Sequence, residues 1–409
     1  MMKLSKTKIS GEITAVPSKS IAQRLYCLSL LSNDTTEIFN PSFSNDSLTM
    51  KTIITKLGCQ IIENPKFETI YPAKISEDAQ INCNESALCA RILSPILSIF
   101  PYKFEIIGNG TLINRPMNDL EQLQQLNAKI KTNSGKLPIQ IEGPISSGEI
   151  YLDLSLSSQF LSGLLIALPK LENPSKITVN NFVSRPYIDL TMDLTKQFGG
   201  NIKLIDENVF EIYPSQYKGG KFKIEGDWSS AIFFLIAGAI AGDCSVYGLN
   251  QNSLQSDKVI IEILKQVGSN IILTNEFISI QKNNLNSFEF DAKDAPDLVP
   301  LLSVLAANCK GESKIYNVER LVFKESDRLN TMILNLRNFG VKANYENQTL
   351  KIVGSKIQGG TFITNNDHRL AMAGALLSLT AENDTIIDSP TCVAKSYPSF
   401  WLDFQKVIL

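Results

Sequence analysis

The sequence predicts an α/β protein of two domains, built from six repeats that each combine two helices with several strands. Three observations support this fold class. The chain has 409 residues, which is too long for one ordinary domain. An amphipathic helix that ends at glycine or asparagine recurs about every seventy residues, and a more apolar helix recurs at nearly the same interval.

The first series consists of amphipathic helices, each closed by a residue that tolerates the left-handed conformation. The stretches after these stops, such as "EFISIQK", alternate as half-buried strands do. The stops are spaced 69, 72, 69 and 72 residues apart. They are Gly58, Asn127, Gly199, Gly268 and Gly340, in "MKTIITKLGCQII", "LEQLQQLNAKI", "MDLTKQFGGNIKLI", "IIEILKQVGSNIIL" and "MILNLRNFGVKANY".

The second series consists of more apolar helices, each opened by small polar or charged residues. Six members lie 66 to 72 residues apart, so the chain contains six repeats, which divide naturally into two domains of three. The openings are anchored at Ser20, Ser86, Ser158, Ser229, Asp297 and His368.

The sixth repeat lacks an obvious exposed helix of the first series. The segment "YPSFWLDFQKVI" is a plausible short helix near the C-terminus. Its strand partner would then have to come from "KISGEITAVP" at the N-terminus. We therefore expect the two ends of the chain to meet in one domain.

Composition and charge exclude several classes of function. The hydrophobic fraction of 44% and charged fraction of 20% are typical of a globular protein, and a net charge of −2 favours neither nucleic acid nor a membrane as partner. The N-terminus lacks the apolar run of a signal peptide, and seven scattered cysteines show no metal-ligand spacing, so we expect a cytoplasmic protein. His368 is the only histidine, which argues against a His-based triad and against a metal site.

Cations recur where the buried helices begin, although the net charge is small. A helix N-terminus carries unpaired N–H groups and a partial positive charge, and is therefore a ready anion site. N-capping explains the polar openings but not the cations, so we expect a ligand with two or more phosphate or carboxylate groups. The cations at these starts are Lys19, Arg24, Arg91 and Arg369. Two more, Lys324 and Arg328, open an exposed helix, and Arg115 and Lys395 lie in loop-like segments flanked by proline.

The segment "FKESDR", residues 323–328, carries charges of both signs. Lys324 and Arg328 would share one face of a helix, and like charges at that spacing are unfavourable. One interpretation is a solvated helix start capped by Ser326 or Asp327; the other is that the two cations are held apart for anionic ligands. Glu325 in such a site could transfer a proton, as could Asp297, for which an N-cap is the alternative role.

The chain resembles the 5-enolpyruvylshikimate-3-phosphate synthases, from about Ile9 to Phe404. The resemblance implies a two-domain inside-out α/β barrel of six βαβαββ-like repeats. It places residues 1–14 and 226–409 in the first domain and 15–225 in the second, with an active site in the interdomain cleft. The matching segments are "PSKSIAQR", "RPMNDL", "SSQF", "SRPYIDLT", "PDLVPLLSVLA", "KESDRL", "NDHRLAMA" and "AKSYPSFW".

This family transfers the enolpyruvyl group of phosphoenolpyruvate to the 5-hydroxyl of shikimate 3-phosphate by addition and elimination, and releases phosphate. The resemblance implies no metal or organic cofactor, catalytic roles for Lys19, Asp297 and Glu325, and a monomer as the expected state. The residues implied for shikimate 3-phosphate are Ser20, Arg24, Ser157, Ser158, Gln159, Ser184, Tyr187, Asp297 and Lys324. Those implied for phosphoenolpyruvate are Lys19, Arg115, Arg328, Arg369 and Lys395.

The chain departs from the family pattern near these residues. The "NAGTAMR" stretch of the family stands here as "ESALCAR", which places Glu85, Ala87 and Leu88 before the retained Arg91, and Arg320 and Val322 replace an asparagine and an arginine. A methyl group at Ala87 is expected to reduce sensitivity to glyphosate, the longer competitor of phosphoenolpyruvate.

Two alternative functions remain open. One is transfer of the enolpyruvyl group to another acceptor, such as UDP-N-acetylglucosamine, by an enzyme of the same fold. The other is a non-catalytic protein that binds shikimate-type ligands.

Overall fold

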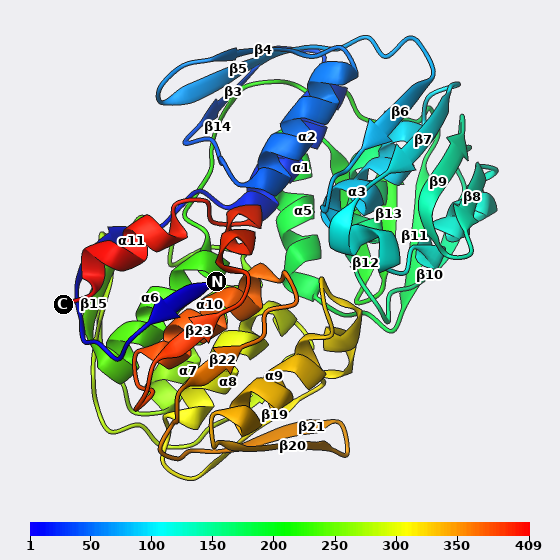
Figure 1. Ribbon diagram of the computed structural model, residues 1–409. Helices are drawn as coiled ribbons and strands as arrows, with labels where there is room; N and C mark the ends of the chain where they lie inside the picture. The colour runs from blue at the N-terminus through cyan, green and yellow to red at the C-terminus, as the bar shows by residue number, and fades with distance from the viewer. The chain divides into compact units, whose positions relative to one another are not determined.

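The computed structural model describes residues 1–409. The chain forms two compact domains. Domain 1 contains Met1–Val16 and Glu225–Leu409, and domain 2 contains Pro17–Ile224. The boundaries expected from the sequence, after residues 14 and 225, lie close to these positions. Domain 1 therefore includes both ends of the chain, whereas domain 2 is one continuous segment (Figure 1).

Five four-stranded sheets and one three-stranded sheet correspond to the six repeats. In each four-stranded sheet a parallel pair of strands is continued by an antiparallel hairpin. For example, β6 (Ala79–Asn82) is parallel to β7 (Lys103–Ile107), and β9 (Lys136–Glu142) and β8 (Lys129–Asn133) follow antiparallel. The parallel strands β6 and β7 are connected through a helix, as parallel pairing requires.

Domain 2 contains three of the sheets. In spatial order they are β14-β3-β5-β4, β6-β7-β9-β8 and β10-β11-β13-β12. The remaining strands are β3 (Thr36–Phe39), β4 (Gln60–Glu63), β5 (Phe67–Tyr71), β10 (Glu149–Asp153), β11 (Ser175–Asn180), β12 (Asn201–Asp206), β13 (Val209–Tyr213) and β14 (Lys221–Lys223). The helices are α1 (Lys19–Leu31), α2 (Asn45–Lys56), α3 (Ala87–Ser98), α4 (Gln159–Ala167) and α5 (Arg185–Gln197), with 3₁₀ helices η1 (Gly110–Asn114), η2 (Asn118–Leu126) and η3 (Leu168–Lys170).

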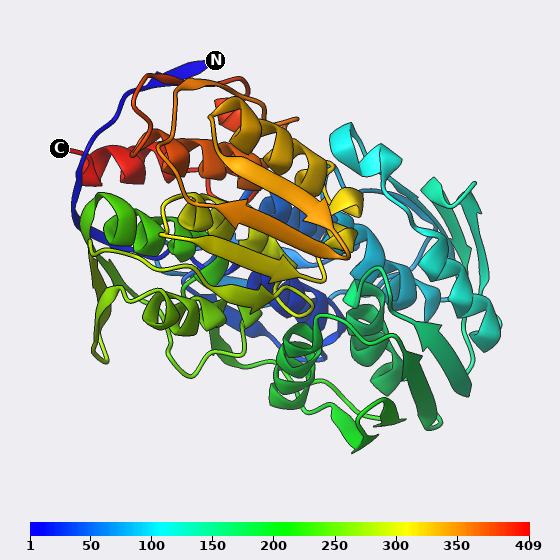
Figure 2. The same cartoon turned by 90° about the horizontal axis from the view of Figure 1, so that it is seen from below.

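Domain 1 contains the sheets β16-β17-β15-β2, β18-β19-β21-β20 and β1-β23-β22. Figure 2 shows the yellow and orange strands of the second of these lying side by side. The strands are β1 (Met2–Leu4), β2 (Ile9–Thr14), β15 (Gly242–Tyr247), β16 (Asn270–Leu273), β17 (Phe277–Gln281), β18 (Glu289–Asp291), β19 (Glu312–Tyr316), β20 (Lys342–Glu346), β21 (Thr349–Val353), β22 (Gly360–Phe362) and β23 (Thr385–Ile387). The helices are α6 (Trp228–Ala241), α7 (Ile260–Gln266), α8 (Val299–Ala307), α9 (Arg328–Asn338), α10 (His368–Ser378) and α11 (Phe400–Val407), with 3₁₀ helices η4 (Ser256–Val259), η5 (Pro296–Leu298), η6 (Glu319–Phe323) and η7 (Pro390–Lys395).

The helices of the second, more apolar series form the centre of each domain. Every residue of α3, α6, α8 and α10 is buried, as expected for helices that are apolar on all sides. Strands such as β9 and β21 instead bury alternate side chains, so the sheets lie outside the helices. Each domain has its own hydrophobic core. No helix reaches the length and hydropathy that a membrane span requires.

The stops of the first series adopt the conformation that the sequence predicts. Gly58, Gly199, Gly268 and Gly340 have φ values of 107°, 90°, 84° and 79°, and Asn127 has 64°. One helix differs from the prediction, because "LEQLQQLNAKI" forms the 3₁₀ helix η2 rather than an α-helix. Its side chains at Leu120, Leu123 and Leu126 repeat every three residues, which suits a 3₁₀ helix.

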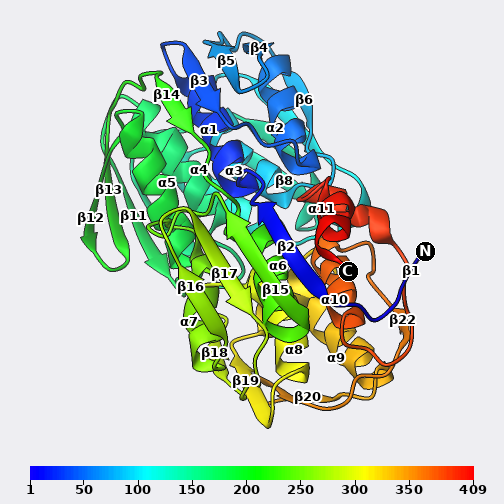
Figure 3. The same cartoon turned by 90° about the vertical axis from the view of Figure 1, so that its left-hand side faces the viewer.

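The two ends of the chain meet in domain 1, as predicted, and α11 forms where the sequence placed a short helix. The pairing of the N-terminal strand was predicted wrongly. The segment "KISGEITAVP" forms β2, which lies parallel to β15 in the fourth repeat (Figure 3). The sixth sheet instead receives β1, which is antiparallel to β23. In the same way, β14 is the parallel neighbour of β3 in the first repeat.

Candidate active site

The predicted site residues lie in two groups, one in each domain. In domain 1 they gather at the N-terminal ends of the buried helices. The Arg369 guanidinium, from the first turn of α10, donates from Nη1 to the carbonyl of Ser229 in the first turn of α6, at 2.8 Å. Asp297 in η5 leads directly into α8. The polar openings of α6 and α10 therefore adjoin one another in this domain.

Arg328 is the centre of the domain 1 group. This first residue of α9 is 1% exposed, and three carboxylates surround its guanidinium. Its Nη1 donates to Asp297 at 2.8 Å, its Nη2 to Glu325 at 2.7 Å and its Nε to Asp367 at 2.7 Å. A second bond from Nη2 to Asp367 measures 3.2 Å, so one of five N–H hydrogens is left for another partner.

Asp367 was not identified from the sequence. It caps α10 by accepting a hydrogen bond from the Arg369 backbone N–H, and its other oxygen also accepts from the Ser326 hydroxyl. The side chain is completely buried. An aspartate directly before an apolar helix is a capping signal, but the sequence gives no sign that the same carboxylate orients Arg328.

The interpretation of "FKESDR" as a shared helix face was wrong. Lys324 ends η6 in an extended conformation, and α9 begins at Arg328 with Asp327 as its N-cap. Both cations contact the same carboxylate, because Lys324 Nζ lies 3.3 Å and Arg328 Nη1 2.8 Å from Asp297 Oδ1. The shared Asp297 carboxylate therefore offsets the repulsion between the two cations.

The charges around Asp297 determine its proton affinity. Burial alone would raise the pKa of Asp297, but Lys324, Arg328 and Arg369 outweigh it and hold the pKa well below its usual range. Burial also lowers the pKa of Lys324, and Asp297 only partly opposes this effect. Asp297 is therefore ionised at neutral pH, but it is a weak proton acceptor while these cations surround it.

Glu325 lies between two cations. Its Oε2 accepts from Arg328, and its Oε1 is 4.0 Å from the Nζ of Lys395, a buried residue at the end of η7. Asp257 in η4 is a further buried acid that the sequence did not single out. It accepts a hydrogen bond from the Ser229 hydroxyl, and burial raises its pKa to about 6.

In domain 2, Arg24 is a buried cation with no carboxylate partner. The side chain is 1% exposed, and burial lowers its pKa to about 10. Its Nε donates to Thr191 at 2.8 Å and its Nη2 to Ser162 at 3.1 Å, while its Nη1 donates to the Ser20 carbonyl at 2.9 Å. The guanidinium carbon lies 5.8 Å from the centre of the Tyr187 ring.

The polar residues at the starts of α4 and α5 adjoin one another. The hydroxyl of Ser158, the N-cap of α4, donates to the Ser184 carbonyl at 3.5 Å, and the Ser157 hydroxyl accepts from the Gln159 N–H at 3.2 Å. Ser184 precedes α5 with a φ of 55°. A left-handed conformation is unusual for serine, and such strain is typical of functional positions.

Lys19, the first residue of α1, forms an ion pair with Asp46 of α2, with Nζ 3.0 Å from Oδ2. Gln23 donates to the hydroxyl of Ser86, the N-cap of α3, at 3.1 Å. The first turns of α1, α2 and α3 therefore adjoin in domain 2. Asp46 is a third acid that the sequence did not identify.

Arg115 lies after η1 in a buried loop that Arg91 holds in place. Arg91 donates to the carbonyl of Pro116, the next residue, at 2.6 Å, and to the Gln159 side chain at 3.1 Å. It also lies 3.5 Å from Asp119, whose pKa burial raises despite this charge. Arg91 thus connects the Arg115 loop with the start of α4.

The residues that depart from the family pattern occur in both domains. The Glu85 carboxylate fills the space beside Gly110, which has a φ of 52° and leaves no room for a Cβ. Ala87 is the buried first residue of α3, followed by Leu88. Arg320 donates to the Lys293 carbonyl, and burial lowers its pKa. No group of three His, Cys, Asp or Glu side chains is placed to hold a metal ion.

Comparisons with known proteins agree over nearly the whole chain. Residues 4–404 match the family model of EPSP synthase (3-phosphoshikimate 1-carboxyvinyltransferase). The chain is similar to the 3-phosphoshikimate 1-carboxyvinyltransferase of Pyrococcus abyssi, with 38% identity over 98% of this chain and 96% of that protein. It is 37% identical to the enzyme of that name from Clostridium perfringens, over 99% and 97% of the two chains. The structure of EPSP synthase from Acinetobacter baumannii has the same fold, with a TM-score of 0.82, 24% identity and coverage of 100% and 99%.

Proposed function

This chain belongs to the EPSP synthase family, and we propose that it transfers the enolpyruvyl group of phosphoenolpyruvate to the 5-hydroxyl of shikimate 3-phosphate. The C–O bond forms between the 5-oxygen and C2 of phosphoenolpyruvate, while C3 gains a proton. In the second step C3 loses a proton and the bond from C2 to the phosphate oxygen breaks, so that phosphate leaves.

The observation that carries the proposal is the buried guanidinium of Arg24. A buried charge is expensive unless a counter-charge accompanies it, and no carboxylate pairs with Arg24. An anionic ligand would supply that counter-charge. We assign shikimate 3-phosphate to Arg24 with Ser20, Ser157, Ser158, Gln159, Ser184 and Tyr187 of domain 2, and Asp297 and Lys324 of domain 1.

Asp297 accepts the proton of the 5-hydroxyl in this proposal. Its depressed pKa in the ligand-free protein argues against that role at first sight. Anionic substrates that bind Lys324 and Arg369 would neutralise two of the three cations responsible, and the pKa would then rise. Asp297 would therefore become a better base only when the substrates are bound.

Phosphoenolpyruvate is assigned to Lys19, Arg115, Arg328, Arg369 and Lys395. Arg328 has one N–H hydrogen to offer while its carboxylate partners stay in place. Lys19 and Glu325 then share the proton transfers at C3 and at the departing phosphate. Because these residues come from both domains, the reaction requires both groups to reach the same pair of substrates, in the interdomain cleft that the resemblance implies.

The proposal is tested by phosphate release from phosphoenolpyruvate with each of two acceptors. Release that depends on shikimate 3-phosphate, with the enolpyruvyl ether identified by mass spectrometry, is the expected result. Release with UDP-N-acetylglucosamine instead would assign another acceptor. Binding of shikimate 3-phosphate without any release would favour a non-catalytic protein.

We also propose that the enzyme acts as a monomer in the cytoplasm and without a cofactor. Both groups of site residues come from a single chain, so no second copy is required to complete them. Light scattering during size-exclusion chromatography tests the monomer, with a mass near 45.3 kDa as the expected value. Activity that survives dialysis against a chelator is expected for the cofactor-free reaction.

A further inference from the structure

A large cavity lies entirely within domain 1, at the C-terminal ends of the three buried helices. Ala241 of α6, Ala307 of α8 and Leu379 after α10 all line it, and its volume is about 1100 Å³. The candidate active site lies at the N-terminal ends of the same helices. A helix rises 1.5 Å per residue, so these two ends are separated by roughly 15–20 Å.

Four lysines line this cavity, and no aspartate or glutamate does. They are Lys6 and Lys8, from the segment between β1 and β2, Lys282 after β17, and Lys310 after α8. All four side chains are exposed and none forms an ion pair. They approach from three separate parts of the chain, so the fold, and not a local charge run, collects them.

The four lysines could instead be present to compensate the negative ends of the helix dipoles, which is a structural role that needs no ligand. Lysines near a helix C-terminus often donate to its last carbonyls. Here other groups do so. The Asn308 amide donates to Val304 at 2.9 Å, and backbone N–H groups of Ser355 and Ala381 donate to the ends of α8 and α10. None of the four lysine side chains makes such a bond, so their ammonium groups are available to a ligand.

The net charge of the cavity still favours an anion. Each helix end contributes about half a negative charge, so three ends offset only part of the four positive charges. The C-terminal residue Leu409 lies near Thr7 and adds one further negative charge at most. A positive excess of about one to two charges therefore remains in a concave site.

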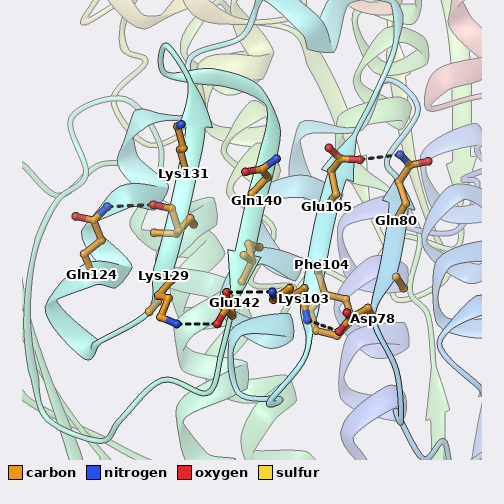
Figure 4. A pocket seen from close by; sticks show the side chains of 14 residues that line it. Asp78, Gln80, Lys103, Phe104, Glu105, Gln124, Lys129, Lys131, Gln140 and Glu142 are labelled. Carbon is orange, nitrogen blue, oxygen red and sulfur yellow. Dashed lines mark hydrogen bonds and ion pairs between the residues drawn. The ribbon is translucent and has the colours of Figure 1, made fainter.

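The hollow on sheet β6-β7-β9-β8 provides a contrast (Figure 4). Three lysines and three acids line it, so their charges balance, and two of the lysines pair with Glu142. Lys129 lies 2.7 Å and Lys103 3.9 Å from Glu142, and Gln80 donates to Glu105 at 2.7 Å. That surface neutralises itself, whereas the lysine-lined cavity does not.

We propose that the lysine-lined cavity of domain 1 binds a small anion that carries two or more phosphate or carboxylate groups. Two or more lysines can contact such a ligand at once, and the exposed amides of Asn284 and Asn286 supply neutral donors. Because the cavity lies at the opposite helix ends from the candidate active site, the anion would bind without displacing substrate.

The test is calorimetric titration of the whole protein with pyrophosphate and, in a second series, with citrate. The test variant is Lys282→Gln/Lys310→Gln. The matched control is Lys314→Gln/Lys351→Gln, which removes the same charge from a sheet of the same domain, where these lysines pair with Glu289 and Glu346. The two ligands distinguish a phosphate site from a carboxylate site.

One binding event should weaken about tenfold in the test variant and remain unchanged in the control, because each exposed ion pair changes binding by up to about fivefold. Binding at the active-site cations should persist in all three proteins, and catalytic turnover should be unaltered. Equal weakening of anion binding in the test and control variants would mean that only the overall charge of the protein matters, and it would overturn the proposal. Unchanged affinity in the test variant, or only one event in the natural protein, would also overturn it. Neither result depends on the identity of the catalysed reaction.

Discussion

Replacement of Asp257 by asparagine should make the protein more stable, and increasingly so as the pH rises. Asp257 is fully buried, accepts hydrogen bonds from Ser229 and Ser256, and has Asp297 and Asp227 in its electrostatic surroundings. Burial raises its pKa from 3.8 to about 6, although the Arg369 charge partly opposes this. Asparagine keeps the size and an acceptor oxygen but never ionises.

The direction of the stability change with pH follows from the pKa values of Asp257 in the folded and unfolded states. The folded state has the higher pKa, so folding favours the protonated acid, and stability falls as the pH rises from about 4 to about 6. One pKa unit corresponds to about 1.4 kcal/mol, so the full penalty above pH 6 is about 3 kcal/mol. Half of it, about 1.5 kcal/mol, develops between pH 5 and pH 8.

Urea unfolding of both proteins at several pH values between 5 and 8 measures this difference. Any effect of the amide on packing is the same at every pH. The growth of the stability difference with pH therefore reports the titration of Asp257 alone. Asp243→Asn, at an exposed position of the same domain, is the control and should show little pH dependence. A stability difference for Asp257→Asn that is constant from pH 5 to pH 8, or that shrinks, would refute the reasoning.

Three predictions concern catalysis. Lys19→Met should lower turnover by orders of magnitude while circular dichroism stays unchanged, since Lys19 opens α1 and its pair with Asp46 lies at the helix starts; near-normal activity would remove it from the site. Asp297→Ala should reduce kcat rather than raise both Michaelis constants, and weaker binding with unchanged kcat would leave it a structural residue. The natural enzyme should resist glyphosate, with Ala87→Gly lowering the inhibition constant about 5- to 150-fold relative to the KM for phosphoenolpyruvate, because overpacking by a methyl costs about 1–3 kcal/mol. An unchanged ratio would contradict this last expectation.

The repeated architecture could be predicted from the sequence because its signals are local. A stop such as Gly199 requires a left-handed backbone, and the apolar run of α6 requires burial on all sides. Both signals act within a few residues, and their period then reveals the repeats. The resemblance to a known family added the domain boundaries and the roles of the site residues.

The rest could not be predicted because it depends on contacts between distant segments. Asp367 and Arg328 are 39 residues apart, and nothing near either residue indicates that they pair. The pKa of Asp257 likewise depends on burial by other elements. The alternation of "KISGEITAVP" predicted a strand, but alternation does not identify the sheet, and two sheets of domain 1 offered an edge.

The pairing of the N-terminal strands β1 and β2 with strands much later in the chain affects how the protein folds during synthesis on the ribosome. Domain 2 is continuous, so it can fold as soon as Ile224 has emerged. Domain 1 must wait, because β2 pairs with β15 and β1 pairs with β23, and both partners are synthesised after domain 2. Meanwhile residues 1–16 must remain unpaired while more than two hundred residues are added, and such exposed strand edges are vulnerable to misassembly. The late step in acquiring activity should therefore be closure of domain 1, at a rate set by these long-range pairings and not by its helices.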